Sequence, residues 1–226
     1  MTFTLVKENA AQICIDSHAA DYKGLKHVAK ILAGDILTVT GKEPEIVEQI
    51  QNVPQIVAAT KGTSDILAKW EEEKKIDLSV LEGKREVFMV QLIEEDGAEK
   101  LVIVGTETIA TLYGLYYISE NIGVSPWVYW ADVVPAPKKE IVFDKSICTV
   151  SKEPSVRYRG FFMNDEWPSL GNFVMHTFGD FNEFFYEKVF DLLLRLKGNY
   201  FWPAMWSASL PLDGSEDPLA ILKLGT

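Results

Sequence analysis

Residues 156–206 constrain the fold more than any other stretch of this chain. They read VRYRGFFMNDEWPSLGNFVMHTFGDFNEFFYEKVFDLLLRLKGNYFWPAMW, with a short apolar run near each end. Residues 157–163 and 199–203 are predicted strands, and residues 181–197 carry apolar side chains at the spacing of a helix laid against a sheet. Polar and aromatic residues follow both strands directly. In a (β/α)8 barrel the chemistry lies where the strands end, so this order predicts the opening βαβ unit of such a barrel.

The ends of the predicted helix carry the usual signals. Asp180 is predicted to be the N-cap, because its carboxylate can accept a hydrogen bond from the first turn. Gly198 is predicted to be the residue just past the last turn, where glycine is common. Arg157 and Arg159 begin the first strand and are predicted to be structural, because that end of a barrel strand serves stability.

The preceding part of the chain, residues 1–150, is predicted to form an N-terminal mixed α/β domain. Its helix and strand patterns alternate, with strands predicted at residues 11–16, 54–60, 87–93, 101–105 and 140–143 and helices at 21–40, 64–75 and 108–121. Residues 151–226 are predicted to begin the barrel, which the sequence leaves truncated. The expected class is therefore α/β: a mixed domain followed by the first βαβ part of an incomplete (β/α)8 barrel.

Charge and composition exclude several classes of partner. The formal net charge of −11 at pH 7 disfavours nucleic acid and anionic membranes. The sequence has no apolar run of membrane-spanning length. The N-terminus lacks the pattern of a secretory signal, so a cytoplasmic location is expected, or secretion if a leader has been removed.

Neither a metal site nor a cofactor is predicted. Cys14 and Cys148 are too few and too far apart for a disulfide framework or a zinc site. His18, His27 and His176 are scattered without ligand spacing. The glycine at residues 105–107, GTE, is weak evidence for a phosphate site, because the full glycine pattern is missing.

Three stretches in this sequence resemble glycoside hydrolase family 115, the xylan α-1,2-glucuronidases. They are YGLYYISENIGVSPWVYWADVVP at residues 113–135, PSVRYRGFFMNDE at residues 154–166 and LLLRLKGNYFWPAMW at residues 192–206. The resemblance covers nearly the whole chain. It implies an α/β domain that leads into a (β/α)8 catalytic barrel, and possible homodimers formed through domains missing here.

The resemblance implies hydrolysis, with inversion, of the bond that links 4-O-methylglucuronic or glucuronic acid to glucuronoxylan or its oligosaccharides. Two departures qualify it. Ile109 and Ala110 stand where a basic residue and a glycine are common in the family. The family motif containing His and Glu after the second barrel strand is absent, so the chain is expected to be inactive alone.

The resemblance and the position after the first strand assign Asp165 and Glu166 as catalytic candidates. Asn164, Trp202 and Trp206 are the candidates for substrate binding. Asp165 and Glu166 are neighbours whose side chains diverge, so they are not expected to form an acid–base pair with each other. The alternative is that residues 164–166 only cap a loop and the next helix, and that the two tryptophans only fill a core.

Two other functions stay open on the sequence. The chain could be a non-catalytic carbohydrate-binding or interaction module that has kept the fold. It could also belong to a related hexosaminidase-like glycosidase with a similar domain before its barrel. The NDE and WPAMW stretches favour the glucuronidase.

Overall fold

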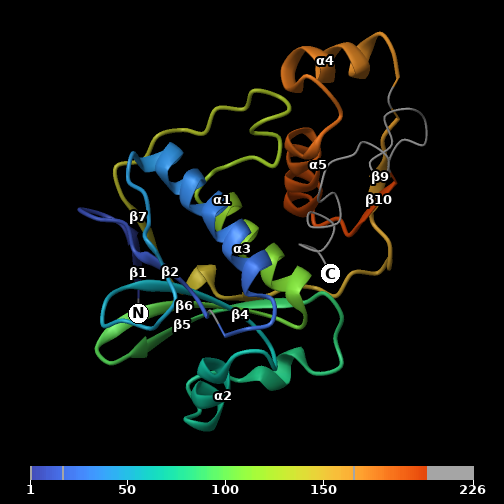
Figure 1. Cartoon of the computed structure of the whole chain (residues 1–226). Coiled ribbons are helices and arrows are strands. Elements are labelled where there is room, and N and C mark those ends of the chain that lie inside the picture. Colours follow the sequence, from blue (N-terminus) through green and yellow to red (C-terminus); the bar gives the residue numbers. More distant parts are fainter. Residues whose placement is uncertain (1, 17, 165, 203–226) are drawn as a thin grey trace. The chain divides into compact units, whose positions relative to one another are not determined.

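The computed structural model describes residues 2–16, 18–164 and 166–202 and divides the chain into two compact units, Met1–Ser155 and Val156–Thr226 (Figure 1). Among the described residues, no helix is both long and apolar enough to cross a membrane. Each unit has its own sheet.

The first unit is built on a six-stranded sheet with the order β3-β2-β4-β6-β5-β8. Strands β3, β2, β4 and β6 run parallel, whereas β5 and β8 are antiparallel to their neighbours. The bounds are β2 Gln12–Ile15, β3 Ile46–Val47, β4 Gln55–Thr60, β5 Phe88–Glu95, β6 Ala98–Gly105 and β8 Thr149–Val150. Every residue of β4 is buried, as expected for a central strand covered on both faces.

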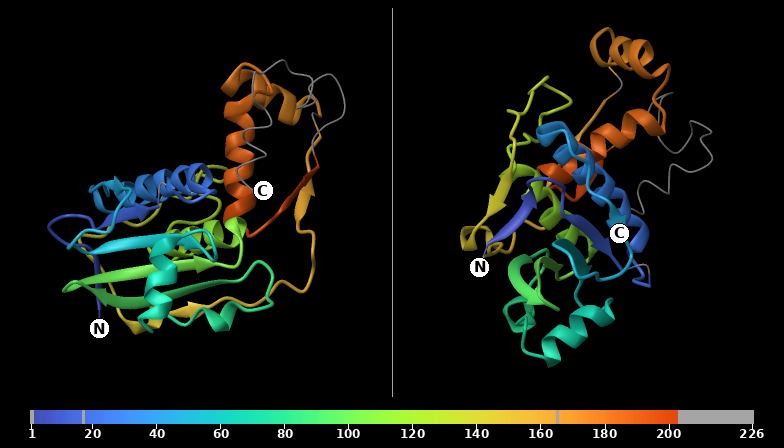
Figure 2. Two further views of the ribbon diagram at one scale, coloured as in Figure 1. Left: turned by 60° about the horizontal axis from the view of Figure 1, so that its bottom comes forward. Right: turned by 90° about the vertical axis from the view of Figure 1, so that its left-hand side faces the viewer.

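Helices cover both faces of this sheet. Helices α1 (Tyr22–Thr40) and α3 (Thr108–Asn121) lie on one side, and α2 (Asp65–Glu72) lies on the other (Figure 1; Figure 2). Two short 3-10 helices, η1 (Leu78–Leu81) and η2 (Lys145–Ile147), complete the unit, together with a separate antiparallel pair of strands, β1 (Phe3–Val6) and β7 (Ile141–Phe143).

The predicted α/β class is confirmed, and several element ends follow the sequence signals. Helix α1 ends at Gly41, which takes a left-handed conformation with φ of 72° and donates its N–H to the carbonyl of Leu37 at 2.7 Å. The turn between β5 and β6 places Asp96 and Gly97 at positive φ, the conformation of a tight two-residue hairpin. That turn lets both strands extend beyond their predicted ends.

Side-chain hydrogen bonds join the helix starts to the carboxyl ends of the parallel strands. The Asp21 carboxylate, just before α1, accepts from the hydroxyls of Thr60 at 2.5 Å and Thr108 at 3.1 Å. The hydroxyls of Thr60 and Thr111 are 2.7 Å apart. These bonds hold α1, β4 and α3 together at one edge of the sheet.

The second unit contains two adjacent parallel strands with two helices between them in the chain. These elements are β9 (Gly160–Phe162), α4 (Ser169–Phe178), α5 (Glu183–Arg195) and β10 (Tyr200–Trp202). The parallel pairing is the one predicted, although both strands are shorter than expected. Helix α4 was not predicted, although Leu170, Phe173, Val174 and Phe178 stand at the spacing of a helical stripe along it.

Both predicted ends of the helix expected at residues 181–197 were wrong. Asn182, not Asp180, is the N-cap of α5, with its side-chain oxygen accepting from the N–H of Phe185 at 3.2 Å. Asp180 instead accepts from the N–H of Phe181 at 2.8 Å. Asn182 is favoured because its own conformation is extended, as an N-cap requires.

At the other end of α5, Lys197 takes the left-handed conformation, with φ of 59°. The N–H of Lys197 donates to the carbonyl of Leu194 at 2.9 Å, and that of Gly198 to Leu193 at 2.8 Å, which is the Schellman pattern. Gly198 is needed for space, because a Cβ there would overlap the Leu193 side chain and lie 3.1 Å from the Arg159 carbonyl oxygen.

Arg159 has the structural role that its position predicted. Its guanidinium donates to the carbonyl of Lys197 at 3.0 Å and to that of Val156 at 2.9 Å. These bonds join the start of β9 to the chain after α5.

Gly34 and Gly114 form a matched test of helix packing. A Cβ on Gly34, in α1, meets nothing within 4 Å, whereas one on Gly114, in α3, overlaps the Cγ2 of buried Ile103 on β6. Gly34→Ala is expected to stabilise the fold by about 0.5–1 kcal/mol, because alanine loses less backbone entropy in a helix. Gly114→Ala is expected to destabilise it by about 1–3 kcal/mol through overpacking.

Urea unfolding of both glycine variants beside the wild type measures these changes. A stabilising Gly114→Ala would contradict the close approach of α3 to β6.

A buried carboxylate ties α2 to β5. The Glu95 side chain is 3% exposed, and it accepts hydrogen bonds from Lys69 at 3.0 Å and from Lys75. Burial alone raises the pKa of Glu95, but hydrogen bonds from Lys75, Lys69 and Trp70 lower it more strongly, to about 2. The ion pairs therefore hold both lysines and α2 in place at neutral pH.

This clamp predicts a loss of stability in acid. Because the pKa of Glu95 is lower in the folded state, its stabilisation is complete above the ordinary value of 4.5 and is lost as the pH falls towards 2. Glu95→Gln is expected to lower the free energy of unfolding at pH 7 by about 1.5–3 kcal/mol, the worth of hydrogen bonds to a charged group. Its unfolding midpoint should also depend less on pH between pH 5 and 2.

Glu94→Gln is the control, because Glu94 is the exposed neighbour in the same strand. Equal pH dependence of the wild type and Glu95→Gln in thermal unfolding would rule out the clamp.

Candidate active site at the ends of strands β9 and β10

The pairing of β9 with β10 brings most of the predicted site together. The two strands run parallel with Phe162 opposite Trp202, so the residues that follow them emerge at the same edge. The N–H of Met163 donates to the carbonyl of Trp202 at 3.0 Å and extends the ladder. Asn164 and Glu166 therefore follow β9 at the edge where Trp202 lies.

The two faces of this strand pair have different partners. The ring of Phe201 packs against those of Tyr186 and Phe190 on α5, with centroids 6.0 and 5.4 Å apart. Since side chains alternate along a strand, Phe162 and Trp202 lie on the opposite face. Their rings meet edge to face at 5.7 Å, and the Trp202 side chain is 49% exposed. Trp202 is thus not part of the core against α5.

Asn164 holds the Glu166 side chain. The amide nitrogen of Asn164 donates to one carboxylate oxygen of Glu166 at 3.1 Å. An ionised carboxylate offers about four acceptor positions, so this bond leaves room for a substrate hydroxyl or a water molecule. Glu166 is exposed and Asn164 half-buried. The arrangement presents an oriented carboxylate at the end of β9.

The alternative, that residues 164–166 serve only as caps, is supported among the described residues by the Glu166 backbone. Its carbonyl accepts from the N–H of Gly171 at 3.0 Å and so supports the first turn of α4. Helix α4 has Pro168 as its N-cap and no side-chain capping bond. The Glu166 side chain is therefore directed to Asn164 and not to the helix. Asp165 and Trp206, the other predicted site residues, lie outside the described residues.

Sequence analysis did not assign Trp167 a role, although it directly follows Glu166. Its side chain is 61% exposed and lies against Gly171 of α4. A large aromatic residue in the loop directly after a predicted strand is the sequence signal that could have identified Trp167.

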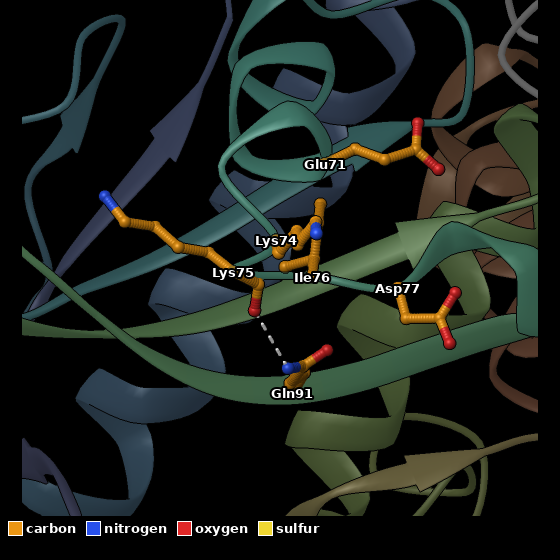
Figure 3. Close-up of a pocket in the computed structure, with 6 residues that line it drawn as sticks. All are labelled: Glu71, Lys74, Lys75, Ile76, Asp77 and Gln91. Carbon is orange, nitrogen blue, oxygen red and sulfur yellow. Dashed lines mark hydrogen bonds between the residues drawn. The ribbon is translucent and has the colours of Figure 1, made fainter.

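Two hollows in the first unit do not offer a comparable site. Figure 3 shows one of them, in which the carboxylates of Glu71 and Asp77 point to one side and the Lys75 amine to the other. The side-chain amide nitrogen of Gln91 donates a hydrogen bond to the Lys75 carbonyl at 3.1 Å. Charged groups that point apart cannot grip one ligand.

A second hollow in this unit is lined by Asp16, Glu48, Asp65, Lys69 and Glu95, together with neighbouring residues. Lys69 and Glu95 are already paired with each other there. Within residues 2–16, 18–164 and 166–202, no group of three or more His, Cys, Asp or Glu side chains could hold a metal ion.

Neighbouring aromatic residues of β10 test the assignment of faces. Phe201→Ala is expected to lower the free energy of unfolding by about 3 kcal/mol, because it removes the ring that packs on α5. Trp202→Ala is expected to change it by less than about 1 kcal/mol, because about half of that side chain is exposed. Chemical unfolding monitored by circular dichroism compares the two. A larger loss for Trp202→Ala would reverse the assignment.

Comparisons with known proteins agree with the resemblance. The family model described as glycosyl hydrolase family 115 matches residues 151–222. The chain is similar to the solved structure of a family GH115 4-O-methyl-α-glucuronidase, BtGH115A, with specificity for decorated arabinogalactans. The two are 32% identical with a TM-score of 0.81, and the match covers 98% of this chain and 28% of that one.

A structure of CpGH84D is also similar, with 11% identity and a TM-score of 0.48, over 99% of this chain and 38% of that one. That likeness carries no argument about function. No curated protein matches the chain. This chain spans 28% of the length of BtGH115A, so the activity of a whole relative is not transferred by the match alone. The identity, the fold match over nearly all of the chain and the family model together show that the chain belongs to glycoside hydrolase family 115.

Proposed function

We propose that this chain supplies part of the active site of an inverting α-glucuronidase. The substrate is a polysaccharide or oligosaccharide that carries 4-O-methylglucuronic or glucuronic acid in α-1,2 linkage. The observation that carries this proposal is the Asn164–Glu166 hydrogen bond of 3.1 Å beside exposed Trp202, at the common edge of β9 and β10. Family membership gives the reaction class, and the edge is where barrel enzymes place their chemistry.

Inverting hydrolysis needs a carboxylic acid that protonates the leaving oxygen and a carboxylate that activates water. The two groups stand about 6.5–9.5 Å apart, so that the water fits between them. We assign to Glu166 the role of the carboxylate that activates water. The hydrogen bond from Asn164 fixes the orientation of its side chain. The acid is assigned to another strand of the complete barrel. Residues 1–226 alone are therefore expected to release no sugar.

Asn164 and Trp202 are assigned to binding. The amide of Asn164 is a neutral donor in a chain with a net charge of −11, where an acidic sugar needs local hydrogen-bond donors. The exposed face of Trp202 offers an apolar surface for the C–H groups of a sugar ring. Together they recognise a polar edge and an apolar face of one pyranose.

The polysaccharide backbone that carries the uronic acid differs between the two lines of support. The sequence resemblance favours glucuronoxylan, whereas the related BtGH115A has specificity for decorated arabinogalactans. Both polymers therefore belong in the assay.

Substitution of the carboxylate tests the function. In the protein at its full natural length, Glu166→Gln is expected to lower kcat at least about 100-fold, the usual worth of general acid–base catalysis. Asn164→Ala is expected to lower kcat/KM about tenfold, because the carboxylate loses its orienting bond. Sugar release from both polymers is measured by chromatography, and NMR of the first product identifies the anomer.

Glu187→Gln is the control, because Glu187 lies in the middle of α5 and not in the loop after β9. Release of the α-anomer first would contradict inversion. Equal kcat for the wild type and Glu166→Gln would remove Glu166 from the mechanism.

A further inference from the structure

Trp167 has an unusual setting for a large aromatic residue. It directly follows Glu166 in the turn that leads into α4, and its side chain is 61% exposed. Tryptophan is highly buried on average, so an exposed indole that is held in place calls for an explanation.

The indole lies flat on the helix backbone. A Cβ built on Gly171 would come within 2.6 Å of Cδ2 and 2.8 Å of Nε1 of Trp167, and it would overlap Cε2. These atoms surround the fused edge of the indole, so the missing side chain of Gly171 is what lets the ring rest there. Gly171 is itself buried. One face of the ring thus lies against α4. The exposed area of the side chain therefore belongs to the other face.

A purely structural role as a hydrophobic staple does not fit. In a staple, the residue before the N-cap packs against the fourth residue of the helix. With Pro168 as the N-cap of α4, those positions are Trp167 and Asn172. Asn172 is polar and exposed, and the indole instead rests on a glycine. Asn172 therefore offers the indole no apolar side chain at the staple position.

We infer that Trp167 is a stacking platform for a neutral pyranose of the backbone, the unit next to the uronic acid. This inference rests on the proposed function, which places the uronic acid at Asn164, Glu166 and Trp202. The C–H face of a sugar packs well on an aromatic ring, and because the uronic acid is already assigned to those three residues, Trp167 is left for the neighbouring unit. Trp167 then contributes to specificity and takes no part in the proton transfers.

The hydrolytic test compares two substrates in the protein at its full natural length. One is a uronic acid attached to a xylo- or galacto-oligosaccharide, and the other is methyl α-glucuronide, which has no neighbouring sugar. Trp167→Ala is expected to lower the ratio of kcat/KM for the oligosaccharide to that for methyl α-glucuronide about tenfold, mainly through KM, because the neighbouring sugar loses the aromatic face on which its C–H groups pack. Trp167→Phe should keep most of the ratio.

Phe184→Ala is the matched control, because Phe184 is also 61% exposed in the same unit but lies on α5. An unchanged ratio in Trp167→Ala, with thermal unfolding like that of Phe184→Ala, would overturn the platform while leaving the proposed function intact.

A binding measurement keeps the two proposals separate. Unsubstituted xylo- and galacto-oligosaccharides are titrated calorimetrically into the wild type and Trp167→Ala. Binding by the wild type that weakens about tenfold in Trp167→Ala supports the platform even if neither substrate is hydrolysed, an outcome that would refute the glucuronidase alone. The oligosaccharide that binds identifies the backbone. No binding of either one by the wild type would refute the platform.

Discussion

The parallel contact between β9 and β10 is the constraint on which the candidate site depends. Gly160 stands opposite Tyr200, and a Cβ on Gly160 would overlap the carbonyl oxygen of Tyr200, so this pairing requires a residue without a side chain. The register then sets which residues share a face. A slip of one residue would exchange Phe201 with Trp202 and put the site tryptophan against α5.

Elements with a strong hydrophobic period could be predicted from the sequence. Features that depend on contacts between residues of different elements could not. Helix α1 and the strands β5 and β6 follow from local patterns that the structure keeps. Helix α4 was missed although its apolar residues stand at helical spacing, because its ten residues are shorter than the window over which a helical period is read. Gly198 was predicted to be the residue just past the last turn of the helix, a position that Lys197 takes instead. The glycine is required for a different reason, the close approach of Leu193 and of the Arg159 carbonyl oxygen.

The candidate site shows the same division. The order of strand, polar loop and aromatic residues predicted that Asn164, Glu166 and Trp202 belong to one edge, and parallel pairing is enough to explain why. The bond from Asn164 to Glu166 and the support of Trp167 by Gly171 could not be predicted. Both depend on how the loop folds back on α4, which no periodic pattern encodes.

The pairing of β9 with β10 has a further consequence for handling the protein. Among the described residues these strands pair only with each other, so each presents one row of N–H and C=O groups without a strand beside it. Such rows act as templates for strands of other molecules. The colloidal behaviour of any preparation will therefore depend on whether these rows are covered. Solubility and filament formation then report whether further strands cover these two edges.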